Sequence, residues 1–188
     1  MRCVKILSVT IVILGALPGC PWMFPVTMEL TPSTVYLAVG QTTQITAEVS
    51  GSYETIEWSI APEGVVSISG TVDATAQIAG MLPGTATLTA VTQPSGASAS
   101  CEIPVADETP PQVTLIGAAE ITVACGSGAY SDPGATVEDN VDTGLVPNYS
   151  GDTVDTETPG QYAVVISATD SSGNAAAQRV RTVHVTDG

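Results

Sequence analysis

Hydrophobic and polar residues alternate along much of this 188-residue chain. The longest alternating run covers residues 43–50, and similar runs cover 86–90 and 162–168. An apolar side chain at every second position is typical of a β-strand that buries one face. After residue 20, no stretch keeps a helical period over a dozen residues. The pattern therefore predicts an all-β fold.

Glycine and proline interrupt these runs at short intervals. The clearest turn signals are Val39-Gly40, Pro83-Gly84, Pro133-Gly134 and Pro159-Gly160. In the first half of the chain, strands are expected at 26–30, 34–39, 41–50, 54–60, 65–69, 84–92 and 97–105. Many short strands separated by such turns are typical of antiparallel β-sandwiches.

A boundary between two modules is expected at Asp107-Glu108-Thr109-Pro110-Pro111. Two prolines cannot continue a hydrogen-bonded ladder, and they stiffen a linker. With 107–111 as the linker, the modules cover 26–106 and 112–188. Each has about 80 residues, which is enough for one small sandwich.

The N-terminal segment has the features of a secretory signal. Arg2 and Lys5 precede a nearly continuous apolar run at 6–17, and Leu17-Pro18-Gly19-Cys20 ends it with small residues before a cysteine. These four residues resemble a lipobox, which implies cleavage before Cys20 and lipidation of its thiol. Residues 1–19 would then be a lipoprotein signal peptide and 20–25 a short tether. The alternatives are an ordinary signal cut nearby and a membrane helix that is never cut.

The charge balance excludes one class of partner. The formal net charge is −15, and loss of the signal would leave only Arg179 and Arg181 against 19 acidic residues. Such a surface repels phosphate backbones, so no nucleic-acid binding is expected. It favours solubility, and it attracts metal cations wherever the acids cluster.

The first module resembles the group 2 bacterial immunoglobulin-like family, which occurs in intimin- and invasin-type surface proteins. The resemblance rests on Leu37-Ala38-Val39-Gly40-Gln41-Thr42, Ile56-Glu57-Trp58-Ser59 and Gly84-Thr85-Ala86-Thr87-Leu88. Trp58 stands where an immunoglobulin-like (Ig-like) sandwich usually buries a tryptophan.

The second module resembles another Ig-like family, found in bacterial surface proteins, spore cell-wall hydrolases and a class of pesticidal crystal protein. The matching segments are Thr109-Pro110-Pro111, Asp132-Pro133-Gly134-Ala135, Glu138-Asp139-Asn140-Val141-Asp142, Pro159-Gly160-Gln161-Tyr162 and Ala168-Thr169-Asp170-Ser171-Ser172-Gly173-Asn174. Thr143-Gly144 departs from the usual Asp-Gly of that family. The fold class is thus expected to be two tandem Ig-like β-sandwiches after a signal peptide. Both resemblances imply extracellular modules used for spacing, display or adhesion.

No catalytic constellation is visible in the sequence, and we expect no enzymatic activity. The single histidine, His184, alternates with Val183 and Val185 and is expected to point toward solvent. There is no second histidine, and no lysine follows Lys5, so no plausible catalytic triad or zinc site can be assembled. A carboxylate pair could still hydrolyse sugars, but no spacing singles one out.

A group of acids in the second module is the candidate metal site. Asp132, Asp139, Asp142 and Asp170 are the candidate calcium ligands, and Asp107 could join them from the linker. Calcium takes six to eight oxygens, often carboxylates from loops. The spacing is not that of an EF-hand. The alternative is that these acids cap turns and stay solvated.

Cys101 and Cys125 are the candidate disulfide pair, because the expected compartment is oxidising. The linker separates them, so the modules would have to fold back on each other to bring their α-carbons within disulfide range. Two unpaired thiols are the alternative.

Together these features predict a cell-envelope lipoprotein, anchored to the outer membrane or cell surface through Cys20 and facing the outside or the periplasm. Its modules would act as a spacer, adhesion or protein-binding element toward an extracellular protein or glycan. The alternative function is an accessory carbohydrate- or cell-wall-binding protein. No cofactor is expected apart from the calcium considered above.

Overall fold

The computed structural model describes residues 26–51 and 55–187. Every helix or strand assigned in these residues is a β-strand, which confirms the all-β prediction. The expected signal peptide, Cys20 and the tether lie outside the described residues. In the described part, no helix is long and apolar enough to cross a membrane. The chain divides into two compact units, Met1–Asp107 and Glu108–Gly188.

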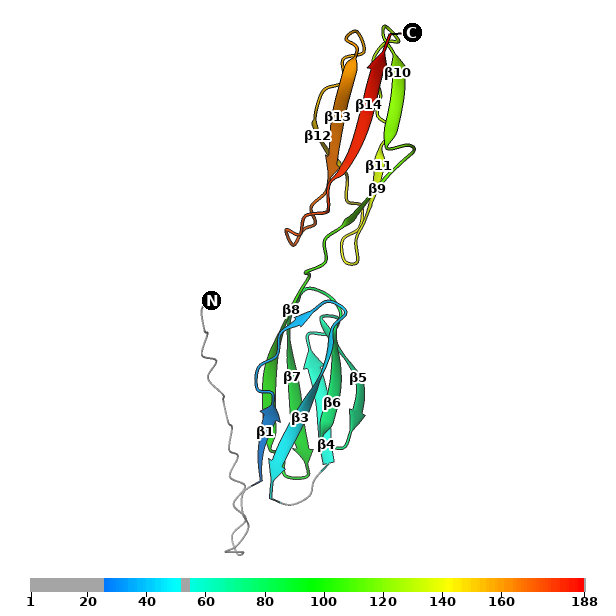
Figure 1. Cartoon of the computed structure of the whole chain (residues 1–188). Helices are drawn as coiled ribbons and strands as arrows, with labels where there is room; N and C mark the ends of the chain where they lie inside the picture. Colours follow the sequence, from blue (N-terminus) through cyan, green and yellow to red (C-terminus); the bar gives the residue numbers. More distant parts are fainter. Residues whose placement is uncertain (1–25, 52–54, 188) are drawn as a thin grey trace, which may run out of the picture. The chain divides into compact units, whose positions relative to one another are not determined.

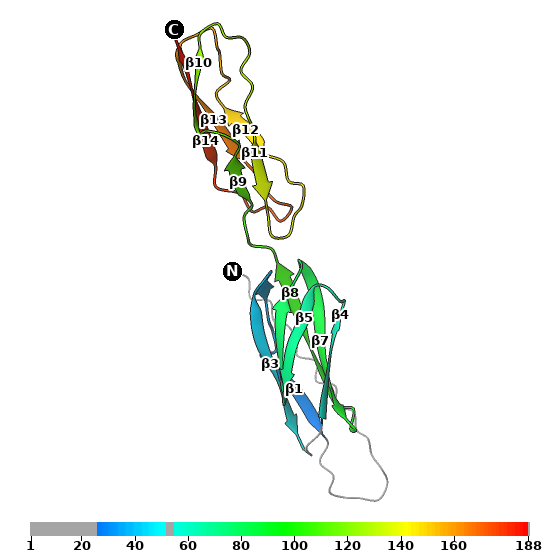
Figure 2. The same cartoon turned by 90° about the vertical axis from the view of Figure 1, so that its right-hand side faces the viewer.

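The first unit is a sandwich of two four-stranded sheets (Figures 1 and 2). One sheet has the order β1-β3-β6-β5 and the other β2-β8-β7-β4. The strands are β1 (Thr27–Thr31), β2 (Leu37–Ala38), β3 (Thr42–Ser50), β4 (Thr55–Ala61), β5 (Val66–Val72), β6 (Thr75–Gly80), β7 (Gly84–Gln93) and β8 (Ser98–Ala106).

The core of the first unit is built from the alternate residues of these strands. Strand β7 buries every second side chain, including Ala86, Leu88 and Ala90, while the residues between them face outward or are half-buried. Ile45 and Ile78, from the opposite sheet, are completely buried in the same cluster. Trp58 on β4 is half-buried and packs against the edge of this core, so its burial is less complete than the sequence suggested.

Strand β6 was not anticipated from the sequence. Its buried positions are Ala76, Ile78 and Gly80, and only one of them is a large apolar residue. Glycine is also forced at position 80, because a Cβ there would lie 2.8 Å from the carbonyl oxygen of Ala38. The small side chains that let β6 pack closely thus also weaken its hydrophobic signal.

The second unit pairs a four-stranded sheet, β10-β14-β13-β12, with a two-stranded sheet, β11-β9 (Figures 1 and 2). Its strands are β9 (Gln112–Leu115), β10 (Glu120–Ala124), β11 (Ala135–Glu138), β12 (Asn148–Gly151), β13 (Gly160–Ser167) and β14 (Arg179–Thr186). The fold of both units confirms the prediction of Ig-like sandwiches.

The core of the second unit is smaller. Val113, Ile166 and Val183 are almost fully buried between the sheets, and Tyr162 packs against them from β13. The Tyr162 hydroxyl donates a hydrogen bond to the carbonyl oxygen of Thr158 (2.9 Å), which satisfies the polar end of a largely apolar side chain.

In each unit, an early strand pairs in parallel with the last strand. Strand β2 runs parallel to β8, and strand β10 runs parallel to β14 along its whole length from Glu120 to Ala124. The other pairings in both units are antiparallel. An early strand and the last strand of each unit therefore lie side by side and point the same way.

Candidate functional site

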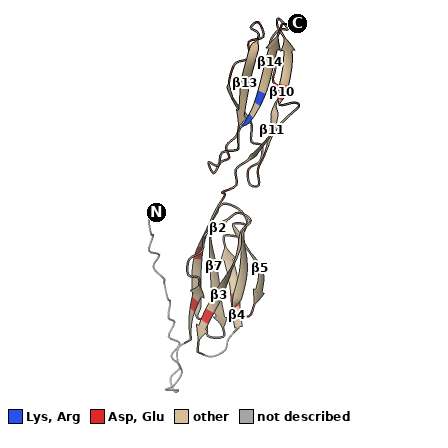
Figure 3. Ribbon diagram, viewed as in Figure 1, with Lys and Arg blue, Asp and Glu red and all other residues tan. Residues whose placement is uncertain are grey.

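The basic residues of the described chain lie on a single strand. Arg179 and Arg181 both belong to β14, where Figure 3 shows the blue positions. Arg179 donates a hydrogen bond from Nε to the carbonyl oxygen of Val113 (3.1 Å). Arg181 has no exposed surface at all, so its charge must be balanced inside the protein.

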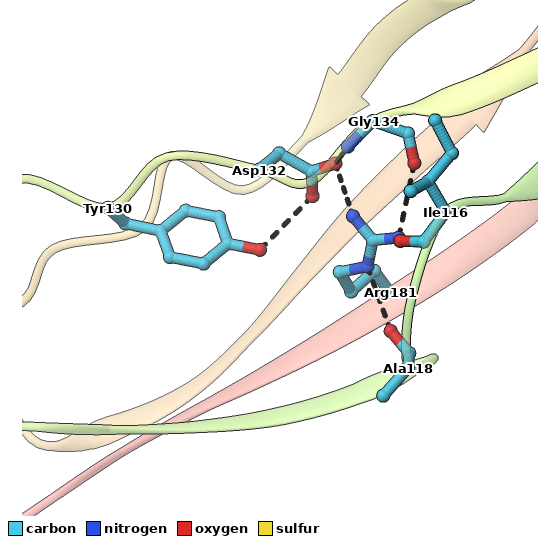
Figure 4. A network of polar contacts seen from close by, with 6 residues as sticks. All are labelled: Ile116, Ala118, Tyr130, Asp132, Gly134 and Arg181. Atoms are coloured by element: carbon cyan, nitrogen blue, oxygen red, sulfur yellow. Dashed lines mark hydrogen bonds and ion pairs between the residues drawn. The ribbon is translucent and has the colours of Figure 1, made fainter.

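The guanidinium of Arg181 is surrounded by oxygen atoms (Figure 4). Nε donates to the carbonyl of Ala118 (3.0 Å), and Nη2 donates to the carbonyls of Ile116 (2.7 Å) and Gly134 (3.2 Å). Nη1 forms an ion pair with Oδ1 of Asp132. These contacts join the loop after β9 to the loop before β11, so Arg181 acts as an internal brace.

Asp132 belongs to this brace. Its carboxylate accepts hydrogen bonds from the Gly134 amide (2.8 Å) and from the Tyr130 hydroxyl (3.1 Å). Desolvation would raise the pKa of Asp132, but the Gly134 amide, Arg181 and Tyr130 outweigh it, and the pKa falls below its usual value. Burial and the neighbouring carboxylate raise the pKa of Tyr130. We expected Asp132 among the metal ligands, and the structure instead places it beside Arg181.

Three other carboxylates of the second unit come together to form the acidic cluster, which we define as Asp139, Asp142 and Asp170. One oxygen from each lies within 4.8 Å of the others. Asp170 is buried, with 7% of its surface exposed, and the other two are half-buried. Three of the four expected ligands are therefore brought together, and Asp132 is not among them.

Backbone hydrogen bonds orient Asp139 at the start of its loop. Its Oδ1 accepts from the amides of Val141 (2.9 Å) and Asp142 (2.8 Å). This is the Asx-turn geometry that Asp adopts readily, so the sequence Asp139-Asn140-Val141-Asp142 forms it locally. The other oxygen of Asp139, Oδ2, is buried and accepts no hydrogen bond.

The other two members of the cluster from this unit are held by the loop before β14. Asp142 accepts hydrogen bonds from the Ser171 amide (2.9 Å) and hydroxyl (2.8 Å). Asp170 accepts from the Asn174 amide (2.7 Å) and side chain (2.8 Å). Desolvation by itself would raise the pKa of Asp170, but the hydrogen bonds outweigh it and lower this pKa below its usual value. The carboxylate of Asp170 is therefore held in its charged form.

The remaining candidates from the sequence lie apart from the cluster. His184 is half-buried on β14 between the buried Val183 and Val185, on the opposite face from them. Cys101 is buried on β8, whereas Cys125 follows β10 in the other unit, and both are free thiols. The disulfide between them stays a prediction.

Comparison with known families matches both halves of the chain. Residues 26–103 match the bacterial Ig-like domain (group 2), and residues 113–185 match the Ig-like domain of bacterial surface proteins. Both matches confirm the family resemblances seen in the sequence, and neither family is an enzyme family. A comparison with curated protein sequences finds no match.

Several solved structures are similar to this chain at low identity. The fibronectin(III)-like modules of CbhA from Clostridium thermocellum are 18% identical, with 86% of this chain and 94% of that chain covered and a TM-score of 0.35. Domains 5–6 of the S-layer protein SbsC are 12% identical, with 85% and 97% covered and a TM-score of 0.33. Titin domains A168–A170 are 15% identical, with 80% and 62% covered and a TM-score of 0.45.

Proposed function

Because the chain carries a group 2 bacterial Ig-like domain followed by an Ig-like domain of bacterial surface proteins, we propose that it is a cell-envelope lipoprotein whose two modules serve as an extracellular spacer or adhesion element. The lipid on Cys20 would hold it at the outer membrane or cell surface. The modules would reach an extracellular protein or glycan partner.

The lipid anchor is supported by the segment before Cys20. Arg2 and Lys5, the apolar run at 6–17 and the small residues before Cys20 fit a cleaved and lipidated signal. Each buried methylene of an acyl chain contributes about 0.8 kcal/mol to membrane attachment, so more than one chain on Cys20 would anchor the protein stably.

The observation that carries the spacer role is the parallel pairing of an early strand with the last strand in each unit. When the two ends of such a unit are pulled apart, adjacent parallel strands must slide along each other, so their hydrogen bonds are loaded together rather than one at a time. Strand β10 has five residues paired with β14, and β2 has two paired with β8. The second unit should therefore resist pulling better than the first.

The side-chain chemistry of the described residues also favours a structural role. The two arginines are held by protein oxygen atoms, and the one described histidine lies away from the acidic cluster. Exposed aromatic rings are few in this part of the chain. Tyr36 is exposed in the first unit and Tyr149 in the second. A protein partner is therefore the better-supported choice over a glycan.

Labelling with radioactive palmitate tests the anchor. The wild-type chain should take up label and fractionate with membranes, and Cys20→Ala should do neither. An unlabelled wild-type protein would refute the anchor.

Force spectroscopy on the purified protein, held at its two ends, tests the spacer. We expect two separate unfolding events, and the second unit should unfold at the higher force. Arg181→Met identifies this event, because the substitution should lower the unfolding force of the second unit only. Unfolding of both units at forces near the instrument baseline would refute the spacer role. Specific glycan-array binding would favour the carbohydrate alternative.

A further inference from the structure

We propose that the acidic cluster, Asp139, Asp142 and Asp170, binds one calcium ion. This inference is independent of the lipid anchor and of the spacer role, because it rests on residues that lie far along the chain from Cys20. Oxygen ligands lie 2.3–2.6 Å from calcium, so two ligands of one ion are never more than about 5 Å apart. The three carboxylate oxygens, all within 4.8 Å of one another, meet this condition.

A buried oxygen atom in the cluster supports the same conclusion independently. Oδ2 of Asp139 is shielded from solvent and receives no hydrogen bond in the described chain. Its partner atom Oδ1 already accepts two backbone amides, so the carboxylate is held in place with Oδ2 left over. A buried carboxylate oxygen without a donor is costly, and a bound cation supplies the missing interaction.

The charge of the cluster requires the same kind of partner. Three carboxylates meet there, and the group contains no basic residue. Of the two described arginines, Arg181 is paired with Asp132, and Arg179 donates to the carbonyl of Val113. Hydrogen bonds from Ser171 and Asn174 keep Asp142 and Asp170 in position, but an uncharged donor cannot neutralise them. A divalent cation would offset two of the three formal charges.

The donor set indicates calcium rather than a transition metal. Every ligand in the cluster is a carboxylate oxygen, whereas zinc and copper sites usually include histidine or cysteine. Calcium accepts several carboxylates together with carbonyl and water oxygens in a flexible shell of six to eight ligands. Extracellular calcium modules typically bind with a Kd of about 10⁻⁴–10⁻³ M, which sets the concentration range for a test.

Asp139→Asn is the most informative variant. The amide is the same size as the carboxylate, and its oxygen can still accept the two backbone amides that Oδ1 accepts now. The change therefore places an NH₂ group at Oδ2 and removes one charge while keeping the turn. Glu138→Gln is the matched control, since it removes one charge from the adjacent, exposed position outside the cluster. Asp142→Asn, which can keep the Ser171 contacts, is the second variant if Asp139→Asn does not fold.

The experiment is calorimetric titration of the EDTA-treated full chain with CaCl₂, followed by thermal unfolding in EDTA and in 5 mM CaCl₂. Wild type and Glu138→Gln should bind one calcium, and calcium should raise the melting temperature of the second unit. Asp139→Asn should bind about tenfold more weakly or worse. The proposal is overturned if calcium gives wild type no binding heat and no melting shift. Equal weakening by both variants would also overturn it, because general charge screening would then explain the binding.

Discussion

Replacing Asp132 with asparagine tests whether the brace around Arg181 holds the second unit together. The change is nearly isosteric, and the new amide oxygen can keep the hydrogen bond from the Gly134 amide. It removes the negative charge opposite a guanidinium that has no exposed surface. Arg181 would then be a buried cation whose remaining partners are backbone carbonyl oxygens.

The expected loss of stability follows from the burial of the pair. Removing one partner of a fully buried ion pair costs about 3–5 kcal/mol. Here the Asp132 side chain keeps 16% exposure, and three carbonyls still accept hydrogen bonds from Arg181. We therefore expect a loss at or just below the lower limit of this range, about 2–3 kcal/mol. For a unit of this size, such a loss lowers the melting temperature by roughly 10–20 °C.

The same contact predicts an acid dependence. The pKa of Asp132 is lower in the folded protein than its usual value. The ionised Asp132 therefore contributes its full share of folding stability above the pKa of the unfolded state, about 3.9. This contribution is lost as the pH falls through the lower pKa of the folded state. The stability gap between wild type and Asp132→Asn should be constant near neutral pH and should shrink below about pH 4.

Differential scanning calorimetry of the full chain measures the loss, and tryptophan fluorescence supplies the internal control. Trp22 and Trp58 both precede the second unit, so their fluorescence should show the same transition in wild type and variant. Arg181→Met and the double variant complete a double-mutant cycle. A loss below 0.5 kcal/mol in Asp132→Asn, or a coupling energy near zero, would show that the ion pair does not hold the two loops.

Three further predictions concern other parts of the structure. Trp58→Ala should destabilise the first unit by about 3 kcal/mol in urea unfolding, because the substitution removes a half-buried indole from the edge of the core. A variant that unfolds like wild type would contradict the packing of Trp58 against this core. Gly151→Ala should destabilise the second unit by more than about 2 kcal/mol in thermal unfolding, because the new Cβ would lie 2.3 Å from a carbonyl oxygen of β13. Gly128→Ala is the control: it has a similar positive φ but open space around the Cβ, and it should cost only about 1 kcal/mol. Equal costs would show that backbone strain alone, and not the steric clash, determines the loss. Iodoacetamide should modify native Cys125 well before Cys101, because burial shields Cys101 and raises its pKa. A non-reducing mass measurement tests the alternative, a disulfide between the two. That disulfide would lower the mass by about two units and leave neither thiol reactive.

The local character of strands and turns explains how much of the fold the sequence predicts. Alternation with a period of two is a property of neighbouring residues, so β3, β7 and β13 could be recognised without any tertiary information. The Asx turn at Asp139 is equally local, since its donors are two and three residues away. Strand β6 was missed because its packing against β2 requires small residues, which carry little hydrophobic signal.

The partners of the charged residues were decided only by the tertiary structure. Asp132 and Arg181 are 49 residues apart, and nothing local distinguishes Asp132 from the other acids of its module. The fold places Asp132 beside Arg181, which is fully buried, and gathers Asp139, Asp142 and Asp170 without it. Sequence alone determined that acids would crowd the loops of the second module. Which of them meet depends on how the sheets bring distant loops together, because electrostatic contacts act through space, whereas the periodic pattern acts along the chain.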